Sequence, residues 1–170
     1  MMLIYESTYA DLYASVVEAF PHTTRRQYAT DPIKVSGIQI VPFVGVRTLF
    51  IKADAINEDR HYRSMILLKD IQYEQNLMTG GIEVVASDGR HVYLHRPSLD
   101  DNNVLVRCSC NDFHWRLNYF NHLDKSLYGR KRSPYEAKIN PGSANPLRSE
   151  GVCKHIMKMA QVLKGSGFLI

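Results

Sequence analysis

The chain has 170 residues, of which 45% are hydrophobic and 22% are charged, an ordinary composition for a globular protein that buries one substantial core or two small ones. No apolar run approaches the roughly 18 to 20 residues that span a membrane, and residues 1–6 lack the basic region and long apolar stretch of a signal peptide. We therefore expect a soluble protein.

Charge is distributed unevenly along the chain, although the formal net charge is only +4. From residue 104 onward there are eleven Lys or Arg and four Asp or Glu, a balance of +7. The first 103 residues carry ten basic and thirteen acidic side chains, a balance of −3. A basic half of this kind can meet nucleic acid, an acidic protein or an anionic lipid, or it can present a solvated face.

The first expected element is a helix over residues 9–20. Ser7 or Thr8 can cap its N-terminus, and Pro21 follows its end. Its apolar side chains recur at the three- and four-residue spacing of one helical face, namely Tyr9, Leu12, Tyr13, Val16, Val17 and Phe20.

A β-rich region follows the first helix. Residues 35–46 and 47–53 are rich in β-branched and aromatic side chains, and Pro42 and Gly45 indicate a bend or an edge. Residues 57–60 predict a loop. Residues 62–73 suit a strand or a short helix, and we favour the strand.

The second half of the chain predicts a hairpin, a further strand and a last helix. Asp88-Gly89 is a tight-turn signal between strands at residues 82–86 and 90–95. Residues 97–103 predict a loop, and residues 104–108 alternate as a strand does. The last helix is expected at residues 151–163, with Gly165 as its C-terminal cap. The expected fold class is α+β, with an N-terminal helix and β-rich region followed by a hairpin, a further strand and a last helix.

All three cysteines of the chain belong to one candidate metal site. Cys108-Ser-Cys110 and the distant Cys153-Lys-His155 together supply three thiols and one imidazole, a complete tetrahedral ligand set for one zinc ion. A disulfide framework would leave one thiol unpaired, and a bridge between Cys108 and Cys110 would be strained. We therefore expect structural zinc and a reducing, intracellular compartment such as the cytoplasm, or a virus particle assembled there.

The residues around these ligands resemble the SWIM-type zinc finger, whose signature is Cys-x-Cys, a variable insertion and Cys-x-His. The similarity covers about residues 82–163 and implies a ββα arrangement with Cys108, Cys110, Cys153 and His155 as ligands. Three flanking positions also match: an aromatic residue after the first pair, a small residue before the second, and the first core position of the helix, which are Phe113, Gly151 and Ile156. The resemblance divides the chain into residues 1–80, of unknown role, and residues 81–170.

The departure from the family pattern is a long insertion at residues 111–152 between the two half-sites. Loops beyond about 12 to 15 residues are usually functional or carry their own structure. This one begins with a short aromatic helix, predicted at residues 112–120. Its Trp115, Tyr119 and Phe120 can stack on bases, but packing against the domain is the favoured interpretation.

Several polar residues after position 104 have both a functional and a structural interpretation. Arg130, Lys131 and Arg132 can contact phosphate or an acidic protein, or stay solvated. Lys154, Lys158 and Lys164 can contact a partner, or can interact with the dipole of the last helix. His114 and His122 are alternative metal ligands with poorer spacing than His155. We expect His61, His91 and His95 to be ordinary strand or loop residues.

These patterns favour a protein that is not an enzyme. A full ligand set leaves no open metal position for activated water, and no nucleotide-binding loop or nucleophile motif is present in the sequence. The favoured hypothesis is a zinc-stabilised structural or adaptor subunit that contacts other proteins in a larger assembly, and the small size and β-rich half suit a virion component such as a phage tail or neck. The alternative is a nucleic-acid-binding accessory protein, and in both cases we expect no membrane partner.

Overall fold

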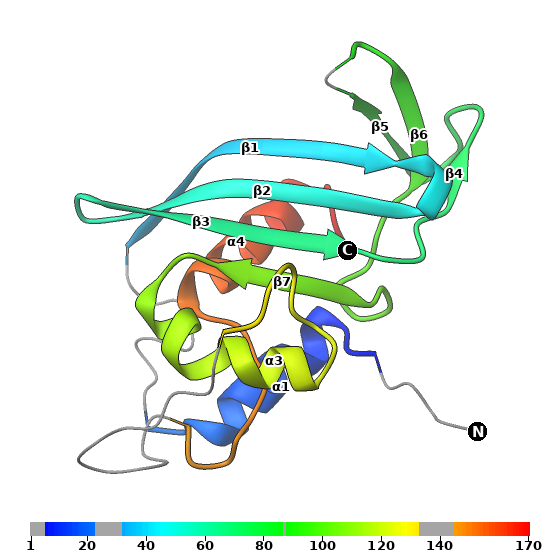
Figure 1. Ribbon diagram of the computed structural model, residues 1–170. Helices are drawn as coiled ribbons and strands as arrows, with labels where there is room; N and C mark the ends of the chain where they lie inside the picture. Colours follow the sequence, from blue (N-terminus) through cyan, green and yellow to red (C-terminus); the bar gives the residue numbers. More distant parts are fainter. Residues whose placement is uncertain (1–5, 23–31, 87, 133–144) are drawn as a thin grey trace, which may run out of the picture.

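The computed structural model describes residues 6–22, 32–86, 88–132 and 145–170. Its described part contains two antiparallel sheets flanked by helices (Figure 1). The larger sheet has four strands in the order β1-β2-β3-β7, which are β1 (Ile33–Phe43), β2 (Thr48–Asn57), β3 (Arg60–Leu68) and β7 (Val104–Cys108). The smaller sheet has three strands in the order β4-β6-β5, which are β4 (Tyr73–Glu74), β6 (His91–His95) and β5 (Gly81–Val85).

The helices lie on one face and at one edge of the larger sheet. α4 (Lys154–Gly165) contacts all four of its strands, and Figure 1 shows it behind the sheet. α1 (Tyr9–Ala19) and α3 (Asn118–Leu123) lie beyond β7, with a π-helical turn, η2 (Phe113–Leu117), directly before α3. A 3₁₀ turn, η1 (Val44–Val46), joins β1 to β2.

The covered face of the larger sheet forms the core because its strands alternate strictly. In β2, every second side chain from Leu49 to Ala55 is buried, and in β3 the same is true of Ser64, Ile66 and Leu68. β7 adds three buried residues in register with them: Val104, Val106 and Cys108. This register carries Cys108 into the core opposite Ser64.

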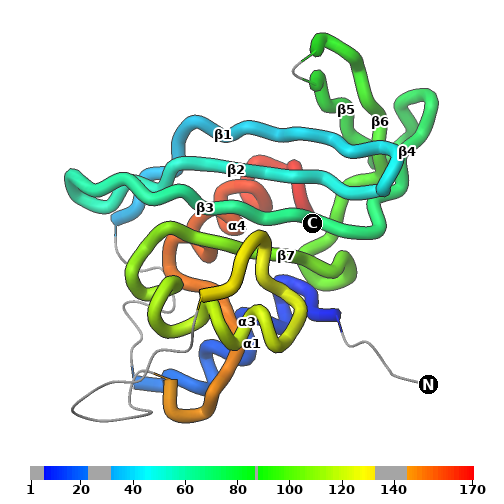
Figure 2. The backbone as a smooth tube through the Cα atoms, viewed as in Figure 1, coloured from blue at the N-terminus to red at the C-terminus, as the bar shows by residue number. Residues whose placement is uncertain are grey.

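The opposite face of the same sheet, here called the open face, has no helix over it in the described part of the chain (Figures 1 and 2). One row of paired residues on it is apolar across all four strands: Val41, Phe50, Leu67 and Leu105. The next row, nearer the metal-ligating end of β7, contains Gln39, Lys52, Met65 and Arg107. The open face therefore changes from apolar to basic along the strands.

The first helix and the β-rich region are confirmed. α1 has a capping box in which the Thr8 hydroxyl accepts from the Asp11 amide and the Asp11 carboxylate accepts from the Thr8 amide. The segment at 62–73 is a strand up to Leu68, and the hairpin at 82–95 forms as β5 and β6.

The last helix differs at both ends from the sequence expectation. It begins at Lys154 rather than at residue 151, because Cys153 is its N-cap residue with an extended backbone. It ends at Gly165 rather than at residue 163, and the positive φ typical of a C-terminal glycine, 81°, occurs at Gly167.

The strand that ends in the first ligand pair joins the larger sheet. The ligand-bearing β7 pairs with β3, from the first 80 residues, and not with the β5–β6 hairpin. Its alternation of buried residues complements that of β3, so that the two strands bury one continuous surface. Both parts of the chain thus contribute to a single cluster of buried apolar residues.

The last residues of the chain also join the core. Leu169 is buried, and the Ile170 backbone exchanges hydrogen bonds with Pro97 and Leu99. None of the described helices has the length and hydropathy that crossing a membrane requires.

Candidate metal centre

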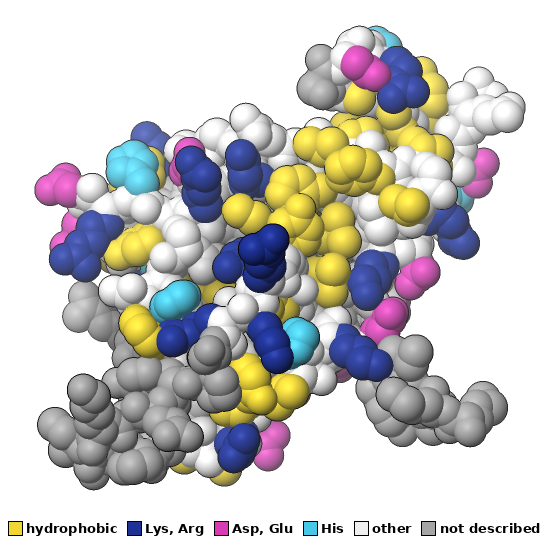
Figure 3. Space-filling model, viewed as in Figure 1, with side chains coloured by type: hydrophobic (Ala, Val, Ile, Leu, Met, Phe, Trp, Pro, Cys, Tyr) yellow, Lys and Arg dark blue, Asp and Glu magenta, His cyan; other side chains and the backbone are white. Residues whose placement is uncertain are grey.

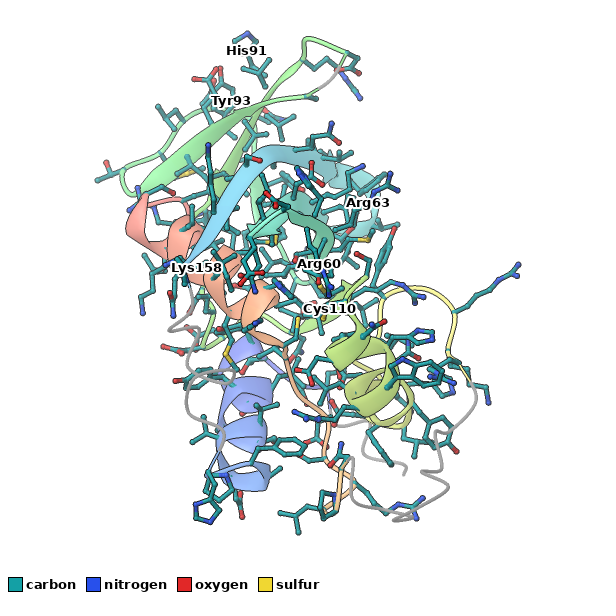
Figure 4. All side chains as sticks on the ribbon, turned by 90° about the vertical axis from the view of Figure 1, so that its left-hand side faces the viewer. Arg60, Arg63, His91, Tyr93, Cys110 and Lys158 are labelled. Carbon is teal, nitrogen blue, oxygen red and sulfur yellow. The ribbon has the colours of Figure 1, made fainter. Side chains whose placement is uncertain are left out.

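The four expected ligands converge from three places in the chain. Cys108 ends β7, and Cys110 lies just before the helical start of the insertion. Cys153 caps α4, and His155 lies in the first turn of that helix. Figure 4 shows Cys110 in the interior, between the sheet, α4 and the insertion. All four side chains are buried, at 2–3% exposure.

The ligand atoms have the spacing of a metal site. The three Sγ atoms and a ring nitrogen of His155 all lie within 4.8 Å of one another. In a tetrahedral site with metal–sulfur bonds of about 2.3 Å, neighbouring ligand atoms are about 3.5–3.8 Å apart. The cluster therefore needs to contract by about 1 Å or less to hold an ion. The set contains His155, and neither His114 nor His122 belongs to it.

The imidazole of His155 presents one defined nitrogen to the thiols. Nδ1 lies 3.9 Å from the Cys108 sulfur and 4.0 Å from the Cys153 sulfur. The ring of Tyr62 packs beside it, with centroids 4.3 Å apart. Nε2 is buried and has no hydrogen-bond partner among the described residues. Because Nδ1 faces two of the sulfurs, it is the nitrogen placed to bind an ion.

Two polar contacts fix the sulfur positions around the cluster. The Ser64 hydroxyl lies 3.6 Å from the Cys108 sulfur, and the Phe113 amide donates to the Cys110 sulfur over 3.3 Å. Hydrogen bonds to ligand atoms orient them and stabilise the charged form. Because the Phe113 amide opens η2, the insertion begins by bonding to a ligand sulfur.

In the absence of an ion, the pKa values of two of the thiols shift in opposite directions. Hydrogen bonds from the Cys110 and Cys153 thiols hold the pKa of Cys108 well below its usual range. Burial raises the pKa of the Cys153 thiol well above that range. A divalent cation would favour the thiolate at every ligand cysteine, so metal binding would release protons.

A buried amide connects the insertion to the second half-site. The Asn121 side chain on α3 accepts from the Gly151 amide at 2.8 Å and donates to the Gly151 carbonyl at 2.9 Å. Asn121 is fully buried, so these two bonds replace water for both groups. The residue two positions before Cys153 is thereby held against α3.

Gly151 is also required for close packing against α1. A Cβ atom placed there would lie 1.7 Å from a methyl carbon of Val16, which is itself buried. Any larger residue would push α1 away from the loop that carries Cys153.

Two of the predicted contact residues of the insertion contact each other. The Arg132 guanidinium lies 3.8 Å from the centre of the Trp115 ring and donates to the His114 carbonyl. Arg130 and Lys131 are exposed, and Tyr119 is half-buried with its ring against Phe120. The described structure thus gives Trp115 and Arg132 intramolecular partners. The part of the insertion at residues 133–144 lies outside the described residues.

Lys154 and Lys158 lie apart from these residues. Both lie on α4, on the covered side of the sheet, and Figure 4 shows Lys158 on the opposite side of the sheet from Arg63. The predicted contact residues therefore do not form one surface.

Residues that support the centre were missed by sequence reasoning. Tyr62 and Ser64 reach it through strand pairing between β3 and β7, which no local motif shows. A polar Ser64 among buried apolar strand residues was the one available signal. No sequence signal indicated the role of Asn121, because an isolated Asn in a polar insertion predicts no particular contact.

The described residues thus define an α+β protein, as the sequence predicts, with a buried Cys₃His cluster that can hold one metal ion. Comparisons with known protein families, with curated proteins and with solved structures give no match. The function is therefore argued from the centre and the surfaces around it.

Proposed function

We propose that the cluster holds one structural zinc ion in a SWIM-type site, and that the protein is a non-enzymatic adaptor subunit of a larger assembly. The observation that carries this proposal is the closed, buried set of three sulfurs and one nitrogen. Thiolate and imidazole ligands suit zinc, and four protein ligands leave no position for a substrate or an activated water.

The ion would act by joining segments that lie far apart in the sequence. Its ligands come from the end of β7, the start of the insertion and the start of α4. With these fixed, both ends of the insertion are held. In an adaptor, such a connection gives a partner a surface of constant shape.

An exposed apolar turn supports a protein partner. The η1 turn carries two exposed valines, Val44 at 50% and Val46 at 71%, next to Phe43 at 47% exposure. A hollow of about 380 Å³ lies between this turn and the β5–β6 hairpin, lined also by Ala86 and Val92. Neighbouring exposed apolar side chains of this kind are typical of protein-binding sites.

Sedimentation of an extract from the natural source, or of particles such as virions, tests the adaptor proposal. We expect the wild-type protein to sediment with a large complex and a Val46→Glu variant to sediment mostly as free protein. Val85→Glu is the matched control, because Val85 is 58% exposed but lies on the far side of the same hairpin. Wild-type protein that sediments as a free chain would refute the proposal.

A nucleic-acid-binding accessory protein is the second candidate. The observation that favours it is the cluster of cations on the open face, which is separate from the η1 turn.

A further inference from the structure

Six basic side chains lie on or beside the open face at its metal-ligating end. We call them the basic band, and they are Lys34, Lys52, Arg63, Arg107, Arg130 and Lys131. The strand residues among them alternate with side chains that point into the core, so their placement follows from the register. Figure 3 shows Lys and Arg side chains over the left and central part of this face and hydrophobic side chains gathered towards the right.

The charges of the basic band are not neutralised within the described part of the molecule. None of its members forms an ion pair there, although Lys69, Arg90 and Arg116 elsewhere do. Asp54, opposite Arg63, is the one acidic residue on the paired rows of this face. A band of several unpaired cations around a single carboxylate attracts a polyanion.

Arg107 extends the basic band beyond the edge of the sheet. Its guanidinium donates to the carbonyls of Tyr128 and Arg130, at 3.1 and 2.9 Å. Gly129, with φ of 83°, lets the chain turn directly against this guanidinium. The Arg107 side chain of β7 therefore holds the exposed Arg130 and Lys131 beside the sheet.

A flat platform adjoins the basic band. The ring of Phe50, in the apolar row, stacks with that of Tyr128 at 5.1 Å between centroids. Leu67 and Leu105 continue the apolar row on the two neighbouring strands. Proteins that bind single-stranded nucleic acid combine cations, which contact the phosphate backbone, with aromatic and apolar side chains, on which the bases stack.

We infer that the open face binds single-stranded nucleic acid, with phosphates on the basic band and bases against the Phe50–Tyr128 pair. A duplex fits this surface poorly, because its grooves accept a helix or a two-stranded ribbon rather than a broad sheet. The inference goes beyond the adaptor function, and the two can fail separately, because the adaptor test changes Val46 and the nucleic-acid test changes Lys52, Arg63 and Tyr128.

The test uses full-length, metal-loaded protein and a fluorescein-labelled oligo(dT) of about 20 nucleotides, which exceeds typical site sizes of about 4–16 nucleotides. Fluorescence anisotropy is measured for wild type, for Lys52→Glu/Arg63→Glu and for the control Lys158→Glu/Lys164→Glu. Both double variants change the net charge equally, but the control cations lie on α4. Metal content and thermal unfolding establish that each variant is folded.

We expect the Lys52→Glu/Arg63→Glu variant to weaken binding at least about 10-fold and the α4 variant to weaken it no more than about threefold. The slope of log affinity against log salt should become shallower by about 1.4 in the open-face variant, at about 0.7 for each lost phosphate contact. A Tyr128→Ala variant should lose about 10-fold, with little change in that slope.

Equal losses in the two double variants would show unspecific attraction and overturn the inference. So would equally tight binding of a duplex of the same sequence length. Poly-glutamate of matching charge serves as a competitor. If it displaces the labelled oligo(dT) as effectively as unlabelled oligo(dT) does, the open face is an acidic-protein surface, and the inference is overturned.

Discussion

At the scale of single residues, the environment of each side chain decides whether its charge or its size stabilises the fold. Asp124 follows α3 and accepts a hydrogen bond from the Ser7 hydroxyl at 2.8 Å. Burial raises its pKa above the usual value, and the charges of Glu150 and Asp11 act in the same direction. The folded state therefore holds the Asp124 proton more tightly than the unfolded chain does.

The stability due to this group should be present at low pH and be lost as the pH rises through the raised pKa. An Asp124→Asn variant mimics the protonated form and can still accept from Ser7. We expect it to unfold at a temperature about 2 °C higher than wild type at neutral pH, with no advantage near about pH 4. The unfolding temperatures of both proteins are measured by circular dichroism between about pH 4 and neutral pH.

Asp88 provides a control of opposite sign. Hydrogen bonds from Arg90 lower its pKa, so its ionised form stabilises the fold and Asp88→Asn should slightly lower the unfolding temperature at neutral pH. Equal shifts in the two variants would contradict the assignment of the Asp124 effect to burial.

Size is decisive at Gly151. A Gly151→Ala change places a methyl group 1.7 Å from a Val16 methyl carbon, and overpacking of this kind costs about 1–3 kcal/mol. Shortening Val16 to Ala should recover part of this cost, so the double variant should be at least about 1 kcal/mol more stable than the sum of the single changes predicts. Denaturant unfolding of the four proteins of this cycle measures the coupling, and strict additivity would contradict direct contact.

At the scale of elements, the helical part of the insertion and the start of α4 act as a unit. Asn121 is the residue that joins them, through two buried hydrogen bonds to Gly151. The metal ligands lie at both ends of this unit, at Cys110 and Cys153. The metal affinity should therefore depend on a residue that touches no ligand.

We expect Asn121→Ala to lower the stability by about 2–4 kcal/mol, because it leaves a buried amide and a buried carbonyl unpaired. It should also weaken metal binding by about 10- to 100-fold, as loss of supporting hydrogen bonds does in other metal sites. Competition with a chromophoric chelator measures the affinity. Asn103→Ala, which removes only an exposed bond to Glu6, is the control and should change neither quantity appreciably.

The elements themselves were largely predictable, whereas their partners were not. The apolar spacing of the first helix and the alternation in β7 are local properties, and both elements occur as expected. The pairing of β7 with β3 depends on which strand arrangement buries the most apolar surface. This arrangement brings together residues about 40 positions apart in the sequence. Cys153 as N-cap likewise follows from the convergence of the ligands and not from helix-start signals.

The same distinction holds for the metal centre. Its four ligands could be read from the sequence because thiol and imidazole spacing is itself chemical information. The support from Tyr62, Ser64 and Asn121 arises only when distant segments meet.

At the scale of the whole molecule, the metal centre lies where the covered face of the sheet, α4 and the insertion meet. Residues from both halves of the chain surround it in one core. An ion bound here would hold both ends of the insertion, and its removal would return the protons to the buried thiols and release those ends. The account predicts that the metal stabilises the entire fold and, through Arg107 and residues 128–131, also the shape of the open face.

X-ray absorption spectroscopy of the purified protein, with elemental analysis of the same sample, tests the central claim most directly. We predict one zinc per chain, coordinated by three sulfur atoms at about 2.3 Å and one nitrogen at about 2.0 Å, with no oxygen ligand. A Cys153→Ser variant prepared in parallel should lose the ion. Purified protein without stoichiometric metal, a coordination shell containing water, or full zinc occupancy in the Cys153→Ser variant would contradict the account.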